Sequence, residues 1–286
     1  MRKPCVFCGS TVKSEEDVLS LWFKKRWEAP EREFFVRVGG TPLRTGKGRP
    51  ARKKHRMWPV LLPSCPHCNG TVLNKLIEIP AQRPVRRLLN EVGALDTVGE
   101  ITAVARWVAK VLLLEAHPLA KHEAYTWRPG ALRGVCDPWE PYPRILLDAI
   151  LAGTVPDDVS LWVAVTGPDG EPDPDFDPVV LQPTERLDGL GGIGRSRYKA
   201  FDLLGTDLMA QFQLVHHPLH DFEHPFQPHG LVTRLWPAPP NGLDLRELPI
   251  LDKTTRLNTT FYTAHEDEFP PIRLAPGHRR TGAAWL

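Results

Sequence analysis

The sequence has no long uninterrupted hydrophobic segment. Its most apolar stretch, residues 101–116, contains Arg106, Lys110 and Glu115, whereas a membrane-spanning helix needs about 20 consecutive, predominantly apolar residues. The opening residues, Met-Arg-Lys-Pro-Cys, also lack the apolar core of a secretion signal. We therefore expect a soluble, cytoplasmic protein that does not associate with a membrane.

Glycine-rich phosphate-binding signatures are also missing. The richest glycine segment, Gly-Leu-Gly-Gly-Ile-Gly at residues 189–194, is neither a Walker loop nor a strand–turn–helix dinucleotide fingerprint. We interpret this segment as a turn, and it does not indicate any of the common nucleotide-binding folds.

Cysteine is scarce, but its placement is informative. Four of the five cysteines form two Cys-x-x-Cys pairs, Cys5 with Cys8 and Cys65 with Cys68, while Cys136 stands alone without neighbours that would mark it as a nucleophile. In a reducing cytosol such pairs are typical of metal ligands and not of disulfides. Four thiolates suit a tetrahedral, structural Zn²⁺ with no open coordination position. The alternative is that the four thiols are ordinary core side chains.

Charge is distributed unevenly along the chain. The net charge is only +2, yet residues 1–90 hold 19 Lys and Arg against 7 Asp and Glu, and the remainder holds 17 against 27. A basic N-terminal part joined to an acidic body indicates an anion-binding region, for which nucleic acid is the commonest ligand.

Hydrophobic patterning predicts helices and strands in both parts of the chain. Ser14-Glu-Glu-Asp17 resembles a helix-capping box, so we expect a short helix after it, with Trp22 on its aromatic face. The other predicted helices cover residues 70–78, 83–92, 101–115 and 143–151. The predicted strands cover residues 34–38, 57–62, 161–165, 198–204, 208–215 and 231–236.

Three short segments together resemble the zinc-containing HNH, or ββα-metal, endonuclease family. They are the Cys-x-x-Cys-Gly knuckle, Glu-Asp-Val-x-x-x-Trp at residues 16–22, and Cys-x-x-Cys-Asn followed by a helix ending in Leu-x-Glu. The resemblance implies an α+β fold with an N-terminal ββα-metal zinc module in residues 1–80, including a basic loop at 44–56. A mixed helical and antiparallel β body would then occupy residues 81–286.

The resemblance also implies a site for phosphodiester hydrolysis. In that family an acid, a general base and an Asn or His ligand surround one divalent ion, Mg²⁺ or Mn²⁺, which stabilises the scissile phosphate. By position, Glu16 matches the acidic ligand, Asp17 the general base, and Asn69 the ligand at the start of the metal-site helix.

The sequence departs from the family at the base. Asp17 stands where the family has His, and an ordinary carboxylate is a poorer base than imidazole by roughly 2 to 3 pK units. Either Glu16, Asp17 and Asn69 hold a metal ion with another base, or nuclease activity is lost. A purely structural alternative also stands, in which both acids and Asn69 cap helices.

A second basic signal lies between the two knuckles. Residues 44–56 carry seven Lys and Arg, and we expect an exposed, mobile loop in which these side chains contact nucleic acid: Arg44, Lys47, Arg49, Arg52, Lys53, Lys54 and Arg56. Lys47-Gly48-Arg49-Pro50 resembles an AT-hook, which inserts into a narrow minor groove. The alternative is nonspecific contact with phosphates.

Histidines cluster near the end of the predicted strands, at positions 216, 217, 220, 224 and 229. Pro218 and Pro225 would break any helix that aligned them. We therefore expect a histidine-rich surface turn in preference to a metal site.

These observations support three hypotheses. The first is a DNA-acting, HNH-type hydrolase with structural Zn²⁺ and catalytic Mg²⁺ or Mn²⁺. The second is a catalytically degenerate relative that binds DNA, a protein partner or a second copy of itself without cleaving. The third is a small-molecule role for the acidic C-terminal half. The sequence leaves open whether the protein is an enzyme.

Overall fold

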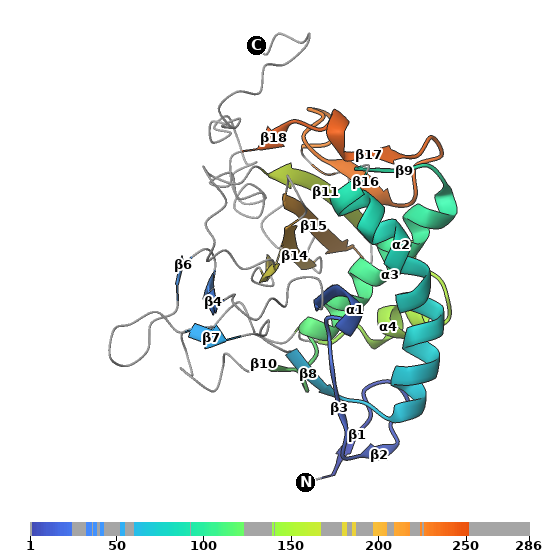
Figure 1. Ribbon diagram of the computed structural model, residues 1–286. Coiled ribbons are helices and arrows are strands. Elements are labelled where there is room, and N and C mark those ends of the chain that lie inside the picture. Colours follow the sequence, from blue (N-terminus) through green and yellow to red (C-terminus); the bar gives the residue numbers. More distant parts are fainter. Residues whose placement is uncertain are drawn as a thin grey trace.

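Figure 1 shows the computed structural model of the protein. The described residues are 2–24, 33–35, 37–38, 41–42, 52–54, 60–91, 93–122, 139, 141–166, 179–181, 185–186, 197–204, 209–217, 224 and 226–251. They contain helices and antiparallel strands, which confirms the predicted α+β class.

The helical segments lie mainly in the first half of the chain. They are α1 (Leu21–Lys24), η1 (Cys68–Glu78), α2 (Ile79–Arg86), η2 (Arg87–Glu91), α3 (Val98–Glu115), α4 (Arg144–Leu151) and η4 (Leu245–Glu247). None of the helices in the described ranges is long and apolar enough to cross a membrane.

The strands fall into one large sheet and several small ones. They are β1 (Lys3–Pro4), β2 (Thr11–Val12), β3 (Glu15–Asp17), β4 (Glu33–Phe35), β5 (Arg37–Val38), β6 (Thr41–Pro42), β7 (Arg52–Lys54), β8 (Val60–Pro63), β9 (Ala94–Leu95), β10 (Lys121–His122), β11 (Val159–Thr166), β12 (Val179–Leu181), β13 (Glu185–Arg186), β14 (Arg197–Leu204), β15 (Met209–His216), β16 (Thr233–Trp236), β17 (Leu243–Asp244) and β18 (Ile250–Leu251).

The segment predicted to cap a helix is instead the strand β3. It pairs antiparallel with β8, so that Glu16 lies opposite Leu62, and β10 pairs with the other edge of β8. The Ser14 hydroxyl donates to the Ser64 carbonyl at 2.5 Å and caps no helix. The capping-box interpretation is therefore wrong, because a partner strand far along the chain takes up these backbone groups; the helix begins only at Leu21.

A long helical rod follows β8. The segments η1, α2 and η2 run without a break, and the turns of η1 are wide: the Ile79 N–H donates to the carbonyl of Asn74, five residues earlier. Pro80 lies inside this continuous rod and can donate no backbone hydrogen bond there; it comes directly after the wide turns of η1. The rod thus passes through residue 80, and the division of the chain at that position stays a prediction.

The helix α3 is the centre of the hydrophobic core. Thr97 caps it, since the threonine hydroxyl accepts from the Glu100 N–H at 3.2 Å. Trp107 and Leu112 are fully buried, and the same core cluster includes Leu62 of β8 and Leu214 of β15. One core therefore joins the small N-terminal sheet, the helices and the large sheet. Figure 1 shows α2, α3 and α4 together on one side of β11, β14 and β15.

The large sheet has seven strands in the order β12-β14-β15-β11-β16, with β13 paired to β14 and β18 paired to β11. All pairings are antiparallel except that of β18, which is parallel to β11. Alternate residues of β11 and β15, such as Val163 and Phe212, face the core cluster. Because successive side chains of a strand point to opposite faces, the sheet has one face toward the core and one opposite face.

The opposite face carries a buried polar network that corrects the histidine prediction. His224 is 0% exposed, and its Nε2 lies 2.7 Å from the side-chain oxygen of Gln213, while its Nδ1 accepts from the Phe226 N–H at 3.1 Å. Burial lowers the pKa of His224 to about 3, so the ring is neutral. His217 is buried as well, with Ser160 at 2.9 Å from its Nε2. At these two positions the expected surface turn is wrong.

Candidate metal centre and adjoining pocket

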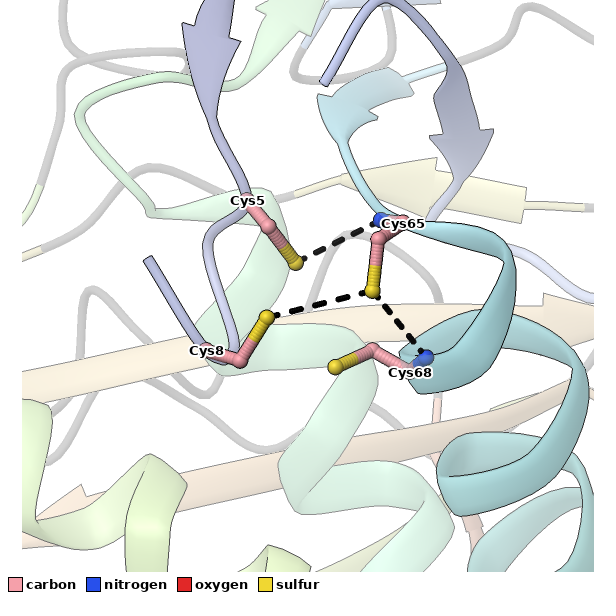
Figure 2. A group of neighbouring side chains, drawn as sticks. All are labelled: Cys5, Cys8, Cys65 and Cys68. Atoms are coloured by element: carbon pink, nitrogen blue, oxygen red, sulfur yellow. Dashed lines mark hydrogen bonds between the residues drawn. The ribbon is translucent and has the colours of Figure 1, made fainter. Parts of the chain in front are cut away.

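The four cysteines of the two knuckles lie together (Figure 2). All four sulfur atoms are within 4.8 Å of one another, and none forms a disulfide. Cys5 and Cys8 come from the turn between β1 and β2, and Cys65 and Cys68 lie where β8 leads into η1. The structure therefore brings together the four predicted ligands of a metal ion.

Backbone hydrogen bonds shape both knuckles around the sulfur atoms. Gly9 closes the first turn with φ of +75°, a conformation that L side chains rarely adopt, and its N–H donates to the Cys5 carbonyl at 2.9 Å. In the second knuckle the N–H of Cys65 donates to the sulfur of Cys5 at 3.4 Å, and the N–H of Cys68 donates to the sulfur of Cys65 at 3.3 Å. Backbone N–H groups aimed at sulfur favour the thiolate form that metal ions require.

The body of the protein also holds the first knuckle. Arg144, at the start of α4, donates to the carbonyl oxygens of Val6 and Phe7, the two residues between Cys5 and Cys8; the bond to Phe7 is 2.5 Å long. The knuckle is thus fastened to α4 by a charged side chain 138 residues away from Val6.

The thiols differ in their ease of ionisation. Hydrogen bonds from Ser10 lower the pKa of Cys8 to about 6, and the backbone N–H of Cys68 lowers the pKa of Cys65. Burial raises the pKa of the Cys68 thiol above its usual range. A metal cation among the four sulfurs would favour the thiolate form of every one of them, so the donor set fits a metal ion.

A cavity of about 820 Å³ adjoins the cysteine cluster. Glu16 and Asp17 of β3 line one part of it, and the helical rod contributes residues at four-residue spacing: Gly70, Asn74, Glu78, Gln82 and Arg86. This spacing places one stripe of the rod along the cavity. The lining mixes carboxylates, amides and two cationic side chains with apolar residues such as Leu62.

The predicted metal ligands Glu16 and Asn69 meet in this cavity. The Asn69 side-chain amide donates to Glu16 at 2.5 Å. Burial raises the pKa of Glu16, although Lys110 and the Asn69 hydrogen bond act in the opposite direction. Asn69 lies inside η1, whose N-cap is His67, so the interpretation of Asn69 as a capping residue is wrong.

Removing the Asn69 amide should raise the pKa of Glu16 further. In Asn69→Ala the carboxylate loses its hydrogen-bond donor while burial still opposes ionisation. The measurement is an NMR titration of the Glu16 side-chain carboxyl. Asn74→Ala is the matched control, because Asn74 lines the same cavity and should leave that titration unchanged. An unchanged or lower pKa in Asn69→Ala would contradict the assignment.

Asp17, the predicted general base, is engaged in an ion pair. One carboxylate oxygen pairs with the ammonium of Lys24, and the other accepts from the Leu19 N–H at 3.2 Å. Lys24 is only 6% exposed, which makes this a largely desolvated pair. The Asp17 carboxylate is thus held by a cation and a backbone N–H, unlike a general base that is free to accept a proton from water.

A third carboxylate of the cavity, missed in the sequence, is neutralised from α3. Lys110 donates to Glu78 at 2.7 Å and to the Val18 carbonyl at 2.5 Å, and Glu78 also accepts from Ser20 and from the Trp22 indole, the latter at 2.8 Å. Burial acting alone would raise the pKa of Glu78, but Lys110 together with the hydrogen bonds from Ser20 and Trp22 outweighs burial, and the net shift is downward. The available signal in the sequence was a lysine inside the most apolar stretch, residues 101–116.

The cavity does not fit a divalent ion on the family pattern. Asn69 presents its amide N–H to Glu16, and the ammonium of Lys24 already pairs with Asp17. In the part of the chain that the structure describes, the four cysteines are the only group of three or more His, Cys, Asp or Glu side chains close enough to share a metal ion.

The predicted nucleic-acid contacts fall largely outside the described residues. Arg44, Lys47, Arg49 and Arg56 lie there, as does the AT-hook-like segment. Residues 52–54 form β7, which pairs antiparallel with β4 so that Arg52 lies opposite Phe35. For these three residues the predicted loop is wrong, because β4 supplies a partner for their backbone groups.

Comparisons with models of protein families, with curated proteins and with solved structures found no match.

Proposed function

We propose that the protein binds DNA through an HNH-type module in which zinc is a scaffold and phosphodiester hydrolysis has been lost. The observation that carries this proposal is the ion pair between Asp17 and the buried Lys24, at the position where the family has its catalytic histidine.

The sulfur geometry supports zinc as the scaffold ion. In a tetrahedral site with Zn–S distances of about 2.3 Å, neighbouring sulfurs are about 3.8 Å apart. The sulfurs of Cys8 and Cys65 are 3.8 Å apart, and the whole group lies within 4.8 Å. Four thiolates leave no position for water or substrate, so the ion would stabilise the two knuckles and take no part in chemistry.

The order of the elements supports the HNH-type assignment. The antiparallel strands β3 and β8 precede the helix η1, and Glu16, Asp17 and Asn69 all line the cavity between them. This is the order in which a ββα-metal module presents its acid, base and helix ligand. In this protein, however, the base position is neutralised by Lys24.

Charge supports DNA as the ligand. The first 90 residues hold 19 Lys and Arg against 7 Asp and Glu, and seven of these basic residues fall in positions 44–56. A protein that neutralises phosphates releases counterions, so its affinity should fall steeply as salt rises.

Binding and cleavage are tested in one set of experiments with zinc-loaded protein. We expect duplex DNA to bind with an affinity that falls with salt, measured by fluorescence anisotropy. Replacing Arg44, Lys47 and Arg49 with alanine should reduce the log–log salt slope by up to about 3, since each phosphate contact contributes about 0.9. Lys75→Ala, an exposed lysine elsewhere, should leave the slope unchanged.

The same protein should not nick supercoiled plasmid with Mg²⁺ or Mn²⁺. Nicking that Asp17→Ala and Asn69→Ala abolish would overturn the proposed loss of hydrolysis. DNA binding without salt dependence, or no binding at all, would overturn the proposed ligand.

A further inference from the structure

We infer that Lys24, the cation paired with Asp17, excludes a divalent ion from that carboxylate. The inference rests on the proposed function in treating Glu16, Asp17 and Asn69 as a former metal site. It goes further by assigning the loss of that site to one side chain, which lies seven residues after Asp17.

The position of Lys24 follows from the local fold. The strand β3 ends at Asp17, the chain turns through residues 18–20, and the short helix α1 carries Lys24 back toward the strand. The Phe23 and Lys24 amides both donate to the Ser20 carbonyl, at 3.0 and 3.1 Å, which fixes this turn. The ammonium thereby reaches the carboxylate from inside the protein, and only 8% of the Lys24 side chain is exposed.

The charges of the cavity balance without a metal ion. Lys24 neutralises Asp17, and Lys110 neutralises Glu78. Glu16 is the remaining carboxylate, and it already accepts from Asn69. A divalent ion would meet one carboxylate that is not in an ion pair, with the ammonium groups of Lys24 and Lys110 nearby and the guanidinium of Arg86 in the cavity lining. Hard divalent ions instead prefer several oxygen ligands with net negative charge.

Displacement of Lys24 by an ion would be unfavourable. Binding at Asp17 would separate the buried Lys24 ammonium from the carboxylate with which it pairs, and breaking a buried ion pair is destabilising. Lys24 is therefore both the counter-charge of Asp17 and a barrier to metal binding. Removal of its charge should convert Glu16, Asp17 and the oxygen of a rotated Asn69 amide into a site for Mg²⁺ or Mn²⁺.

The test measures Mn²⁺ binding to the zinc-loaded full-length chain by calorimetry, with the electron paramagnetic resonance signal of free Mn²⁺ as a second readout. We expect the unchanged protein to bind no Mn²⁺ that depends on Asp17. Lys24→Met should gain one Mn²⁺, bound at least about tenfold more tightly than any Mn²⁺ that associates with the unchanged protein. The double variant Lys24→Met with Asp17→Asn should lose that ion again.

Two further variants control for charge and folding. Lys24→Arg keeps the positive charge and should gain no Mn²⁺, and Lys13→Met removes an exposed lysine and should also gain none. Circular dichroism and one zinc per chain establish that each variant is folded; Lys24→Gln replaces Lys24→Met if the latter is not. The inference is overturned if folded Lys24→Met and Lys24→Gln gain no ion, or if the unchanged protein binds one Mn²⁺ that Asp17→Asn removes. The DNA-binding assay is independent, so its failure would overturn the proposed function while leaving the Mn²⁺ result standing.

Discussion

Cys68→Ala is expected to release the metal ion and unfold the N-terminal part of the protein. Cys68 is buried in the core cluster with Cys5, and its sulfur is one of the four that lie within 4.8 Å of one another. Structural zinc sites contribute about 10 to 16 kcal/mol of apparent binding free energy in small zinc modules at neutral pH. That exceeds or equals the net stability of most domains, which is about 5 to 15 kcal/mol.

The experiment compares metal content, by elemental analysis, with thermal unfolding followed by circular dichroism. Cys136→Ala is the matched control, since it removes the one cysteine outside the two Cys-x-x-Cys pairs and should keep one metal ion per chain. Chelation of the metal from the unchanged protein should reproduce the loss of structure seen in Cys68→Ala. A Cys68→Ala protein that keeps its metal ion and its unfolding temperature would contradict the assignment of a four-thiolate structural site.

The second large effect is expected at the buried ion pair between Glu78 and Lys110. Lys110 is 2% exposed and Glu78 is 8% exposed. Their ion pair connects the helical rod to α3, and both residues line the cavity. Lys110→Met leaves the Glu78 carboxylate buried without its counter-charge. Loss of one partner of a buried pair typically costs about 3 to 5 kcal/mol, which urea unfolding at neutral pH should reveal.

The pH dependence of the destabilisation in Lys110→Met distinguishes the loss of the ion pair from a loss of packing. Lys110 holds the pKa of Glu78 below its ordinary value, so the pair contributes stability above the unfolded pKa of about 4.3 and loses it as the pH falls through the folded pKa. In Lys110→Met only the hydrogen bonds from Ser20 and Trp22 still oppose the effect of burial, so the Glu78 carboxyl is protonated at higher pH. The difference in unfolding free energy between the two proteins should therefore shrink in acid.

A double variant isolates the pairwise interaction. Glu78→Gln combined with Lys110→Met removes both charges, while an amide at position 78 still has Ser20 and Trp22 as neighbours. We expect the double variant to be clearly more stable than the sum of the two single effects predicts. Additive effects, or a Lys110→Met loss that is independent of pH, would argue for a packing role only.

Several features followed from the sequence because their causes are local. The two Cys-x-x-Cys pairs were recognised as one cluster, since thiols at this spacing share a chemical preference wherever the chain carries them. The helix α3 and the strand β11 followed from hydrophobic patterning over windows of 8 to 18 residues. Glu16, Asp17 and Asn69 were grouped by family resemblance, and all three do line one cavity.

Other features depend on partners far along the chain, and local patterns predicted them wrongly. Ser14-Glu-Glu-Asp17 has the composition of a helix start, yet β8 takes up its backbone groups in a sheet. The histidine-rich segment is polar in composition, yet His224 is buried against Gln213 and Trp162 on the second face of the sheet. In both cases a tertiary contact outweighed a weak local preference.

The sequence by itself determined that this protein has two Cys-x-x-Cys pairs suited to one metal ion, an α+β fold and a basic N-terminal region, because those properties reside in residue type and short-range periodicity. Only the tertiary structure decided the electrostatic state of the cavity. The pairing of Asp17 with Lys24, and of Glu78 with Lys110 across 32 residues, depends on how α1 and α3 pack beside β3 and the helical rod. The chemical role of a charged side chain depends on its partner and on its burial in the folded protein, and the pattern of neighbouring residues specifies neither.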